Sequence, residues 1–323
     1  MGKLIADKYN QWESECEARF QKLKANEEEL NRIFIDIYGL QDELTPDVAD
    51  KDVTVHRVFT SRDDVPESMK GSNYVRTMRD EIVSLISYAV GCMFGRYSLD
   101  VEGLAYAGGE WDGSKYKTFL PDEDNCIPVT DEEYFKDDIV GRFVEFVRTV
   151  YGSDTLEENL DFIANALAGK GSTSREVIRN YFLNDFIKDH IKTYQKRPIY
   201  WMFDSGKQNG FKALVYMHRW NADTTGNVRV EYLHRVQRVY ESEIARMQDT
   251  IDNSSNAREV SAAQKRKDKL TKQLKESKDY DAKIAHLALS RIDIDLDDGV
   301  KVNYEKVQTG QDGKKIEILT AIK

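Results

Sequence analysis

The residues best suited to chemistry lie between positions 188 and 220, where cations, amides and aromatic rings are interleaved along the chain. Basic side chains neutralise phosphates, side-chain amides read base edges through paired hydrogen bonds, and aromatic rings stack on bases. Two β-rich runs, 199–203 and 211–217, flank a turn that contains Gly and Asn, which predicts a β-hairpin. The turn at 206–210 would place a lysine and two amides at a tip small enough to enter a major groove.

Within this segment we predict two kinds of contact with DNA, base contacts from the hairpin tip and phosphate contacts from the surrounding cations. The alternative is a half-buried sheet whose aromatic residues form a core and whose charged residues are merely solvated. For Trp201 and Phe203 we favour the core, and for Arg96 and Tyr97 we favour packing at a helix end. The predicted base contacts are Lys207, Gln208 and Asn209, and the predicted phosphate contacts are Lys196, Arg197, Lys212 and Arg219.

The elements that must position these residues are mostly helical. Apolar residues that recur at three- and four-residue steps share one helix face. Residues 45–72 have the composition of a linker, and the Gly-rich residues 95–128 that of loops with short strands at most. Gly39 is expected to end the first helix. The predicted helices cover residues 3–44, 74–94, 131–151, 154–168 and 173–193.

The last third of the chain has a different pattern. Residues 227–291 carry an approximate apolar heptad with a break at 253–256, which predicts a long antiparallel helical hairpin similar to a coiled coil. Residues 292–323 alternate polar and apolar positions and are expected to be β. We therefore expect an α+β, mainly helical chain. Its predicted domains are a helical linker (1–60), a DNA target-recognition domain (61–226), the helical hairpin (227–291) and a small β tail (292–323).

Charge is distributed unevenly, although the formal net charge is −10. Residues 100–160 carry 16 acidic and 5 basic side chains, whereas residues 161–225 carry 6 acidic and 10 basic ones. Binding to a polyanion depends on the local field at the docking face, so an acidic total does not exclude DNA. The helical hairpin has basic residues that could follow a DNA backbone, although a solvated helix face is the favoured explanation. They are Arg258, Lys265, Arg266, Lys267, Lys269, Lys272 and Lys275.

Other chemistries lack their motifs in this sequence. No Gly-Lys pair is followed by Ser or Thr, so there is no P-loop, and no His-Glu-x-x-His metal motif occurs. Cys16, Cys92 and Cys126 are widely spaced and fit neither a disulfide framework nor a zinc site. No apolar run approaches the ~18 residues of a membrane span. We expect a cytoplasmic protein without a membrane partner, without a metal and without nuclease activity.

Five segments resemble the C-terminal half of the PglX family, the large adenine-specific DNA methyltransferases of BREX phage-defence systems. The similarity extends over nearly the whole chain, and the strings are long and unusual. They are EELNRIFIDIYGLQDELTP (28–46), LISYAVGCMFGRYSLD (85–100), KRPIYWMFDSG (196–206), GFKALVYMHR (210–219) and IDLDDGVK (294–301).

The resemblance implies a division of labour. S-adenosylmethionine and the Asn-Pro-Pro-aromatic loop that holds a flipped base would belong to an N-terminal domain, and the remainder would help to recognise DNA. None of the five prolines here is adjacent to another, so that loop is absent and no catalytic or cofactor-binding residue can be assigned. We expect no activity of this chain alone. Met1 and Gly2 resemble an added start on a truncated protein, with a naturally split subunit as the alternative.

Double-stranded DNA is the partner that this interpretation predicts, with the chain positioning a duplex for methylation. The alternative function is a protein-interaction module, in which the 227–291 hairpin and the acidic 100–160 stretch dock other BREX subunits. The heptad pattern and the local excess of carboxylates favour that alternative.

Overall fold

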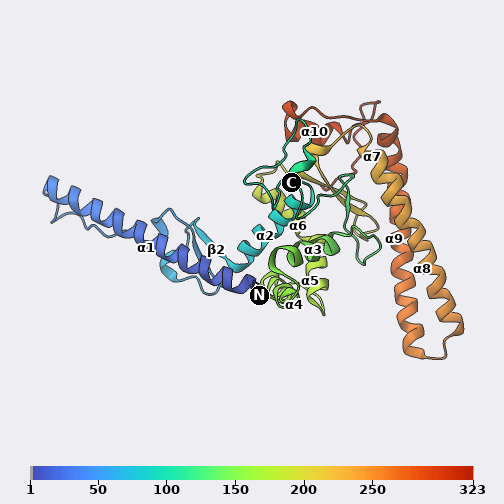
Figure 1. Ribbon diagram of the computed structural model, residues 1–323, viewed down its shortest axis with the longest axis horizontal. Helices are drawn as coiled ribbons and strands as arrows, with labels where there is room; N and C mark the ends of the chain where they lie inside the picture. The colour runs from blue at the N-terminus through green and yellow to red at the C-terminus, as the bar shows by residue number, and fades with distance from the viewer. Residues whose placement is uncertain (1–2, 323) are drawn as a thin grey trace. The chain divides into compact units, whose positions relative to one another are not determined.

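The computed structural model describes residues 3–322, and Met1 and Gly2 lie outside the described residues. The fold is α+β and mainly helical, as predicted, and Figure 1 shows its elements in chain order. The chain forms two compact units, residues 1–86 with 150–168 and residues 87–149 with 169–323. Within residues 3–322, no helix combines the length and the apolar character needed to cross a membrane.

The first unit is built on one long helix, α1 (Ile5–Tyr38), which ends as predicted at Gly39. Gly39 has a φ of 69°, the left-handed conformation that glycine adopts without a Cβ clash. Helix α4 (Leu156–Leu167) packs near the start of α1, where Asn159 Oδ1 accepts a hydrogen bond of 2.7 Å from the Ile5 N–H. The aromatic rings of Tyr9 and Phe162 also meet there.

Residues 45–72, expected to form a linker, instead pack along α1. They contain the 3-10 helices η1 (Asp50–Asp52) and η2 (Glu67–Met69) and strand β1 (Arg57–Phe59), which pairs in parallel with β2 (Val75–Thr77). The segment folds because Val53 and Met69 are fully buried against Phe20 of α1. The Pro and Asp residues suggested flexibility, but they fall at turns between buried apolar anchors.

The second unit contains the predicted β-hairpin at the centre of a small antiparallel sheet. Strand β4 (Tyr200–Asp204) pairs with β5 (Lys212–Tyr216), and β5 pairs on its other side with β3 (Ile127–Pro128). Trp201 and Phe203 are completely buried, so the expectation that they belong to the core is confirmed. The hairpin is therefore part of the core and not a surface ribbon.

The C-terminal tail is only partly β. Residues 318–320 run along β4, where Leu319 forms an antiparallel bridge with Phe203 and the Thr320 N–H donates to the Met202 carbonyl. The expected alternation ends at Gly299, however, and Val300–Lys306 forms the helix α10 after the short η6 (Leu296–Asp298). Tyr304 and Val307 are buried at helical spacing, which outweighs the two-residue period.

One predicted helix is divided, and the helix predicted over 131–151 begins only at Ile139. The expected helix 173–193 breaks at Asp185, whose φ and ψ of −124° and −34° separate α5 from α6. Thr173 caps α5 by accepting a hydrogen bond from the Glu176 N–H. The remaining elements are α2 (Met78–Met93), η3 (Gly113–Lys115), α3 (Ile139–Tyr151), α5 (Ser174–Asn184), α6 (Phe186–Thr193), η4 (Met217–Arg219) and α7 (Thr224–Asn227).

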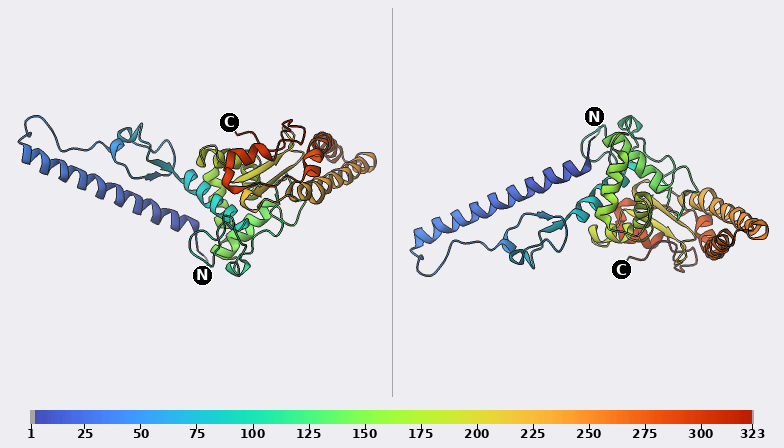
Figure 2. Two further views of the ribbon diagram at one scale, coloured as in Figure 1. Left: turned by 90° about the horizontal axis from the view of Figure 1, so that it is seen from above. Right: turned by 90° about the horizontal axis from the view of Figure 1, so that it is seen from below.

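The predicted helical hairpin is present. A π-helical turn, η5 (Val228–Leu233), leads into α8 (His234–Asn253), which returns as α9 (Ala257–Ser290) after a short break. Figures 1 and 2 show α8 and α9 side by side along their length. At the base of the hairpin, the Tyr232 hydroxyl lies 2.8 Å from a carboxylate oxygen of Asp124 and of Asp137. The acidic segment is therefore attached to the hairpin by hydrogen bonds.

The first residues of β4 are held by a buried histidine. His190 Nε2 accepts hydrogen bonds from the N–H groups of Ile199 (3.0 Å) and Tyr200 (3.1 Å), which requires a neutral imidazole at that nitrogen. Burial, together with the positive charge of Arg96, lowers the pKa of His190 to about 3. The backbone at the start of the hairpin therefore depends on an uncharged ring.

We predict that this histidine makes the fold less stable in mild acid. The unfolded chain protonates His190 near its ordinary pKa of 6.5, whereas the folded chain resists protonation down to about 3, so stability is lost as the pH falls through this window. The expected contribution is about 2 kcal/mol between pH 7 and pH 5. Urea unfolding at both pH values measures it.

The His190→Gln variant should lose that part of the pH dependence, whereas His56→Gln, at an exposed position, should keep it. Variants must be compared because protonation of the buried Asp122 changes the stability of the fold in the opposite direction. Burial and the neighbouring Asp124 raise the Asp122 pKa to about 7, which favours the folded state as the pH falls. Equal pH slopes for wild type and His190→Gln would contradict this role of the histidine.

Candidate nucleic-acid interface

The connection between β4 and β5 is a short, internally bonded loop at residues 205–211. The Ser205 N–H donates to the Phe211 carbonyl, and the Phe211 N–H donates to the Ser205 hydroxyl at 2.8 Å. Asn209 adopts a left-handed φ of 53°, a conformation that asparagine tolerates better than most residues. The loop therefore has a defined shape, with Lys207 and Gln208 exposed and Asn209 half-buried.

One carboxylate of α9 holds this loop in place. Glu276 accepts hydrogen bonds from the Ser205 hydroxyl (2.8 Å), the Gln208 N–H (2.8 Å) and the Gly210 N–H (3.0 Å). Hydrogen bonds to a charged acceptor are stronger than neutral ones. The predicted tip is consequently seated on a helix from the far end of the sequence.

The contact between loop and helix is too close for a larger residue at the end of the loop. A Cβ added to Gly210 would lie 2.5 Å from the backbone oxygen of Gln273. The Gln273 side-chain amide also donates to the Asn209 carbonyl at 3.3 Å. Gly210 therefore allows the backbone of the loop to approach the backbone of α9.

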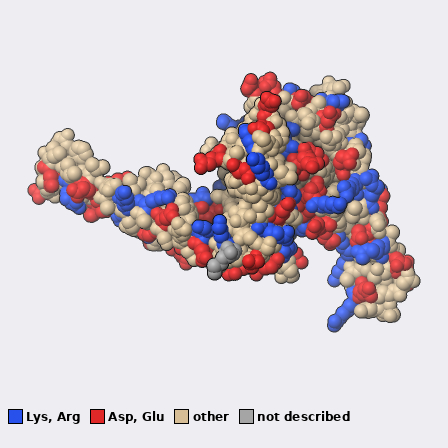
Figure 3. Space-filling view, viewed as in Figure 1, with Lys and Arg blue, Asp and Glu red and all other residues tan. Residues whose placement is uncertain are grey.

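The helix that holds the loop also carries exposed lysines. Lys272 precedes Glu276 by four residues, so the two lie on neighbouring turns of the same face, whereas Lys275 is adjacent in sequence and lies about 100° around the helix. Both lysines are exposed, as are Lys207 and Gln208 of the loop. We call these four residues the loop–helix surface. Figure 3 shows Lys and Arg side chains gathered over the α8–α9 hairpin.

The cations of α9 that could follow a DNA backbone, for which a solvated helix face was the favoured explanation, differ in their partners. Arg266 and Lys269 form ion pairs with Asp131 of the acidic segment. Burial opposes ionisation of Asp131, but the hydrogen bond and charge of Lys269 outweigh it and hold the Asp131 pKa below its usual value. Lys267 donates to Gln248. Within residues 3–322, the cations of this set without a carboxylate oxygen within 4.0 Å are Arg258, Lys265, Lys267, Lys272 and Lys275.

Two predicted phosphate contacts make internal contacts instead. Lys212 is 8% exposed, and its ammonium donates to the Leu183 carbonyl at 3.0 Å and lies 3.5 Å from Asp204. The Arg219 guanidinium donates to the backbone oxygens of Asp122 (2.7 Å) and Glu123 (2.9 Å). These contacts favour structural roles for both cations.

Arg96 also makes contacts of the expected packing kind. Its guanidinium donates to the Tyr216 hydroxyl at 3.1 Å and lies 5.4 Å from the centre of the Tyr97 ring. Tyr97 itself stacks on Tyr88. The packing of this pair beside β5 favours a structural role over contact with DNA.

Lys196 and Arg197 are exposed but lie at the opposite end of β4 from the loop. A five-residue strand is about 17 Å long, so the predicted site is divided between two ends of the hairpin. Lys196 borders a pocket of about 310 Å³ that the C-terminal tail shares. Other residues lining it are Lys301, Tyr304, Glu305, Gln308, Lys315 and Glu317.

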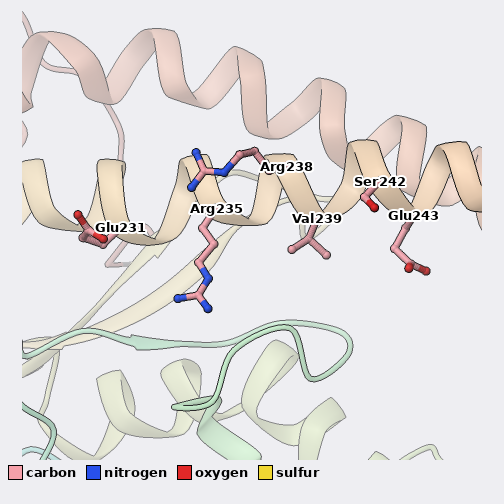
Figure 4. A pocket seen from close by; sticks show the side chains of 6 residues that line it. All are labelled: Glu231, Arg235, Arg238, Val239, Ser242 and Glu243. Carbon is pink, nitrogen blue, oxygen red and sulfur yellow. The ribbon is translucent and has the colours of Figure 1, made fainter.

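A shallow groove of about 510 Å³ runs along α8 and has a mixed charge (Figure 4). Arg235 and Arg238 point in different directions from the helix, and Glu243 projects close to the same groove. Glu243 pairs with Arg246 at 2.6 Å. Because Glu231 and Glu243 flank the two guanidinium groups, this groove is less suited to a phosphate backbone than the loop–helix surface.

Sequence reasoning missed the two α9 residues that position the loop, Glu276 and Gln273. Both lie within a lysine-rich helix, and their partners are more than sixty residues away. A lone glutamate between Lys275 and Lys278 was a weak signal, since it interrupts a run of cations.

Among residues 3–322, no group of three or more His, Cys, Asp or Glu side chains could hold a metal ion.

We predict that Glu276→Ala releases the loop without unfolding the hairpin helices. Three donors lose a charged acceptor, which should cost about 1–3 kcal/mol and speed hydrogen exchange at the Gln208 and Gly210 amides. Asp279→Ala, an exposed change of equal charge on the same helix, is the matched control. Unchanged exchange at both amides in Glu276→Ala would show that Glu276 does not hold the loop.

Two curated proteins are similar to nearly the whole chain, whereas no family model matches it. The chain is 50% identical over 303 residues to the adenine-specific methyltransferase PglX of Lacticaseibacillus casei (strain Zhang), an alignment that covers 93% of this chain and 24% of that protein. It is 40% identical over 304 residues to the adenine-specific methyltransferase BrxX of Escherichia coli O9:H4 (strain HS), covering 89% of this chain and 25% of the relative.

The chain thus spans about a quarter of the length of the curated relatives it matches. The resemblance that the five sequence segments indicated is confirmed at an identity well above chance. Over nearly its whole length, the chain is similar to the C-terminal part of PglX-type adenine-specific methyltransferases.

Proposed function

We propose that this chain is the DNA target-recognition part of a BREX-type adenine-specific methyltransferase and that it binds and positions duplex DNA. The observation that carries the proposal is the Glu276 carboxylate, which seats the 205–210 loop beside the free lysines of α9. The similarity to methyltransferases named adenine-specific supports it, since an enzyme of that name must select a base.

The chemistry of the loop–helix surface suits a duplex. Lys207, Lys272 and Lys275 supply ammonium groups that can neutralise phosphates, and none has a carboxylate within 4.0 Å among residues 3–322. Gln208 is exposed and can offer a donor and an acceptor to a base edge. Because the Gln208 backbone N–H is hydrogen-bonded to Glu276, the backbone that carries this side chain is held in place.

The acidic total of the chain is compatible with this proposal because many carboxylates face internal partners. Asp131 pairs with cations of α9, and Asp124 and Asp137 contact the Tyr232 hydroxyl. Association should nevertheless be modest at physiological salt and strongly salt-dependent.

Methyl transfer itself is assigned to the remainder of a PglX-type enzyme. The base-holding Asn-Pro-Pro-aromatic loop does not occur in this sequence, and no residue here can be assigned to the binding of S-adenosylmethionine. The pockets described above are open and lined by charged side chains of helices and the tail, which does not suit the apolar, enclosed binding of a cofactor. We therefore propose no chemical step on this chain.

We predict that Lys272→Ala/Lys275→Ala weakens binding to all duplexes. Losing two phosphate contacts should lower the log–log salt slope by about 1.8, because each contributes about 0.9. Titration of labelled duplexes at several salt concentrations measures the slope. The matched control is Lys8→Ala/Lys22→Ala, which removes two exposed lysines from α1 and should leave the slope unchanged.

The loop variant tests sequence selection in the same assay. Lys207→Ala/Gln208→Ala/Asn209→Gly removes the candidate base contacts and keeps the left-handed backbone at position 209. Discrimination between target and scrambled duplexes should fall about 10-fold. If a full-length enzyme with these changes methylates the same site at the same rate, the loop does not read the target.

A second candidate function is the docking of other BREX subunits. The mixed charge of the α8 groove favours it, because a surface with both cations and carboxylates suits a protein partner better than a phosphate backbone. Absence of binding to any duplex at low salt would favour this candidate over the DNA-binding proposal.

A further inference from the structure

The last third of α1 exposes a row of large apolar side chains. Leu30, Phe34 and Ile37 are 55%, 55% and 68% exposed, and Ile33 is 44% exposed. Their spacing of three and four residues places all four on one face of the helix. We call these four residues the α1 apolar face. Figure 3 shows tan side chains at this end of α1, with acidic and basic side chains beside them.

The opposite side of the same helix turns is already occupied. Segment 46–48 returns along α1, where Asn31 donates to the Pro46 carbonyl and Glu28 accepts from the Val48 N–H. Ile35 lies on this occupied side and is 8% exposed. Both views in Figure 2 show the returning segment beside α1. The α1 apolar face is therefore not covered by its own unit.

Such an exposure needs an explanation, because soluble proteins rarely leave contiguous apolar patches of this kind uncovered. Apolar anchors at positions i, i+3, i+4 and i+7 are the pattern by which one helix binds in a hydrophobic groove of another protein domain. Leu30, Ile33, Phe34 and Ile37 have that spacing.

We propose that the α1 apolar face docks into an apolar groove on the methyltransferase part of a PglX-type enzyme, an inference that rests on the proposed function. The curated relatives are about four times longer than their match to this chain, so most of such an enzyme lies outside the described structure. The docked helix would join the recognition part to the part that transfers the methyl group.

A second copy of this chain is a poorer occupant because of the surrounding charge. Glu27, Asp36, Asp42 and Glu43 lie on or just after the same stretch of α1, and Arg32 is already paired with Glu29. Two copies would bring these carboxylates together, which is unfavourable. The groove we propose is accordingly apolar with a basic rim.

Cysteine labelling tests the docking without any measurement of DNA binding. The native Cys16, Cys92 and Cys126 are buried, so Ile37→Cys introduces an accessible thiol. Its rate of reaction with a maleimide is measured in this 323-residue chain and in a full-length PglX-type enzyme carrying the same sequence. We expect a rate at least 10-fold lower in the full-length enzyme.

Lys8→Cys, at an exposed position near the start of α1 and away from the α1 apolar face, is the control and should react equally in both proteins. Equal rates at position 37 would overturn the proposal. Slow labelling in the 323-residue chain that depends on its concentration would overturn it as well, in favour of a second copy. If the thiol at position 37 reacts equally in both proteins while DNA binding is intact, only the docking is rejected. If that thiol is protected in the full-length enzyme but the chain does not bind DNA, only the proposed function is rejected.

Discussion

The arrangement of the candidate interface depends on one carboxylate. Glu276 accepts hydrogen bonds from a hydroxyl and two backbone N–H groups of the hairpin loop, and the Gln273 side chain adds a longer hydrogen bond to the Asn209 carbonyl. A loop that carried Lys207 and Gln208 without this support would sample many conformations and lose entropy on binding. With it, the loop that carries Lys207 and Gln208 is held on α9, the helix that carries Lys272 and Lys275.

The charge of the candidate interface depends on which cations of α9 have a carboxylate partner. Where the acidic segment meets the helical hairpin, Asp131 pairs with Arg266 and Lys269 and offsets their charge. Lys272 lies about one turn and Lys275 about two turns beyond Lys269 along α9, and both are exposed. A chain with a net charge of −10 can therefore present a local cationic surface, because pairing is decided residue by residue.

Sequence predicted the elements better than it predicted the roles of single side chains. The hairpin, the stop at Gly39 and the break between α8 and α9 were predictable because each depends on neighbours in the sequence. The tail was predicted less well, since an alternating pattern could not show that Tyr304 would be buried as part of a helix. Lys212 resembled a phosphate contact only while Leu183, its partner from α5, was unknown. Glu276 could not be found for the same reason, because its three partners lie about seventy residues earlier in the chain.

Hydrogen exchange of the chain with and without duplex DNA tests the central claim most directly. We expect slower exchange of amides in 205–210 and in the 265–276 part of α9 when DNA is added, with both segments protected at the same DNA concentration. The α1 amides should not change. Protection that spares both segments, or that appears in only one of them, would contradict the claim that the loop and the helix form a single DNA-binding surface.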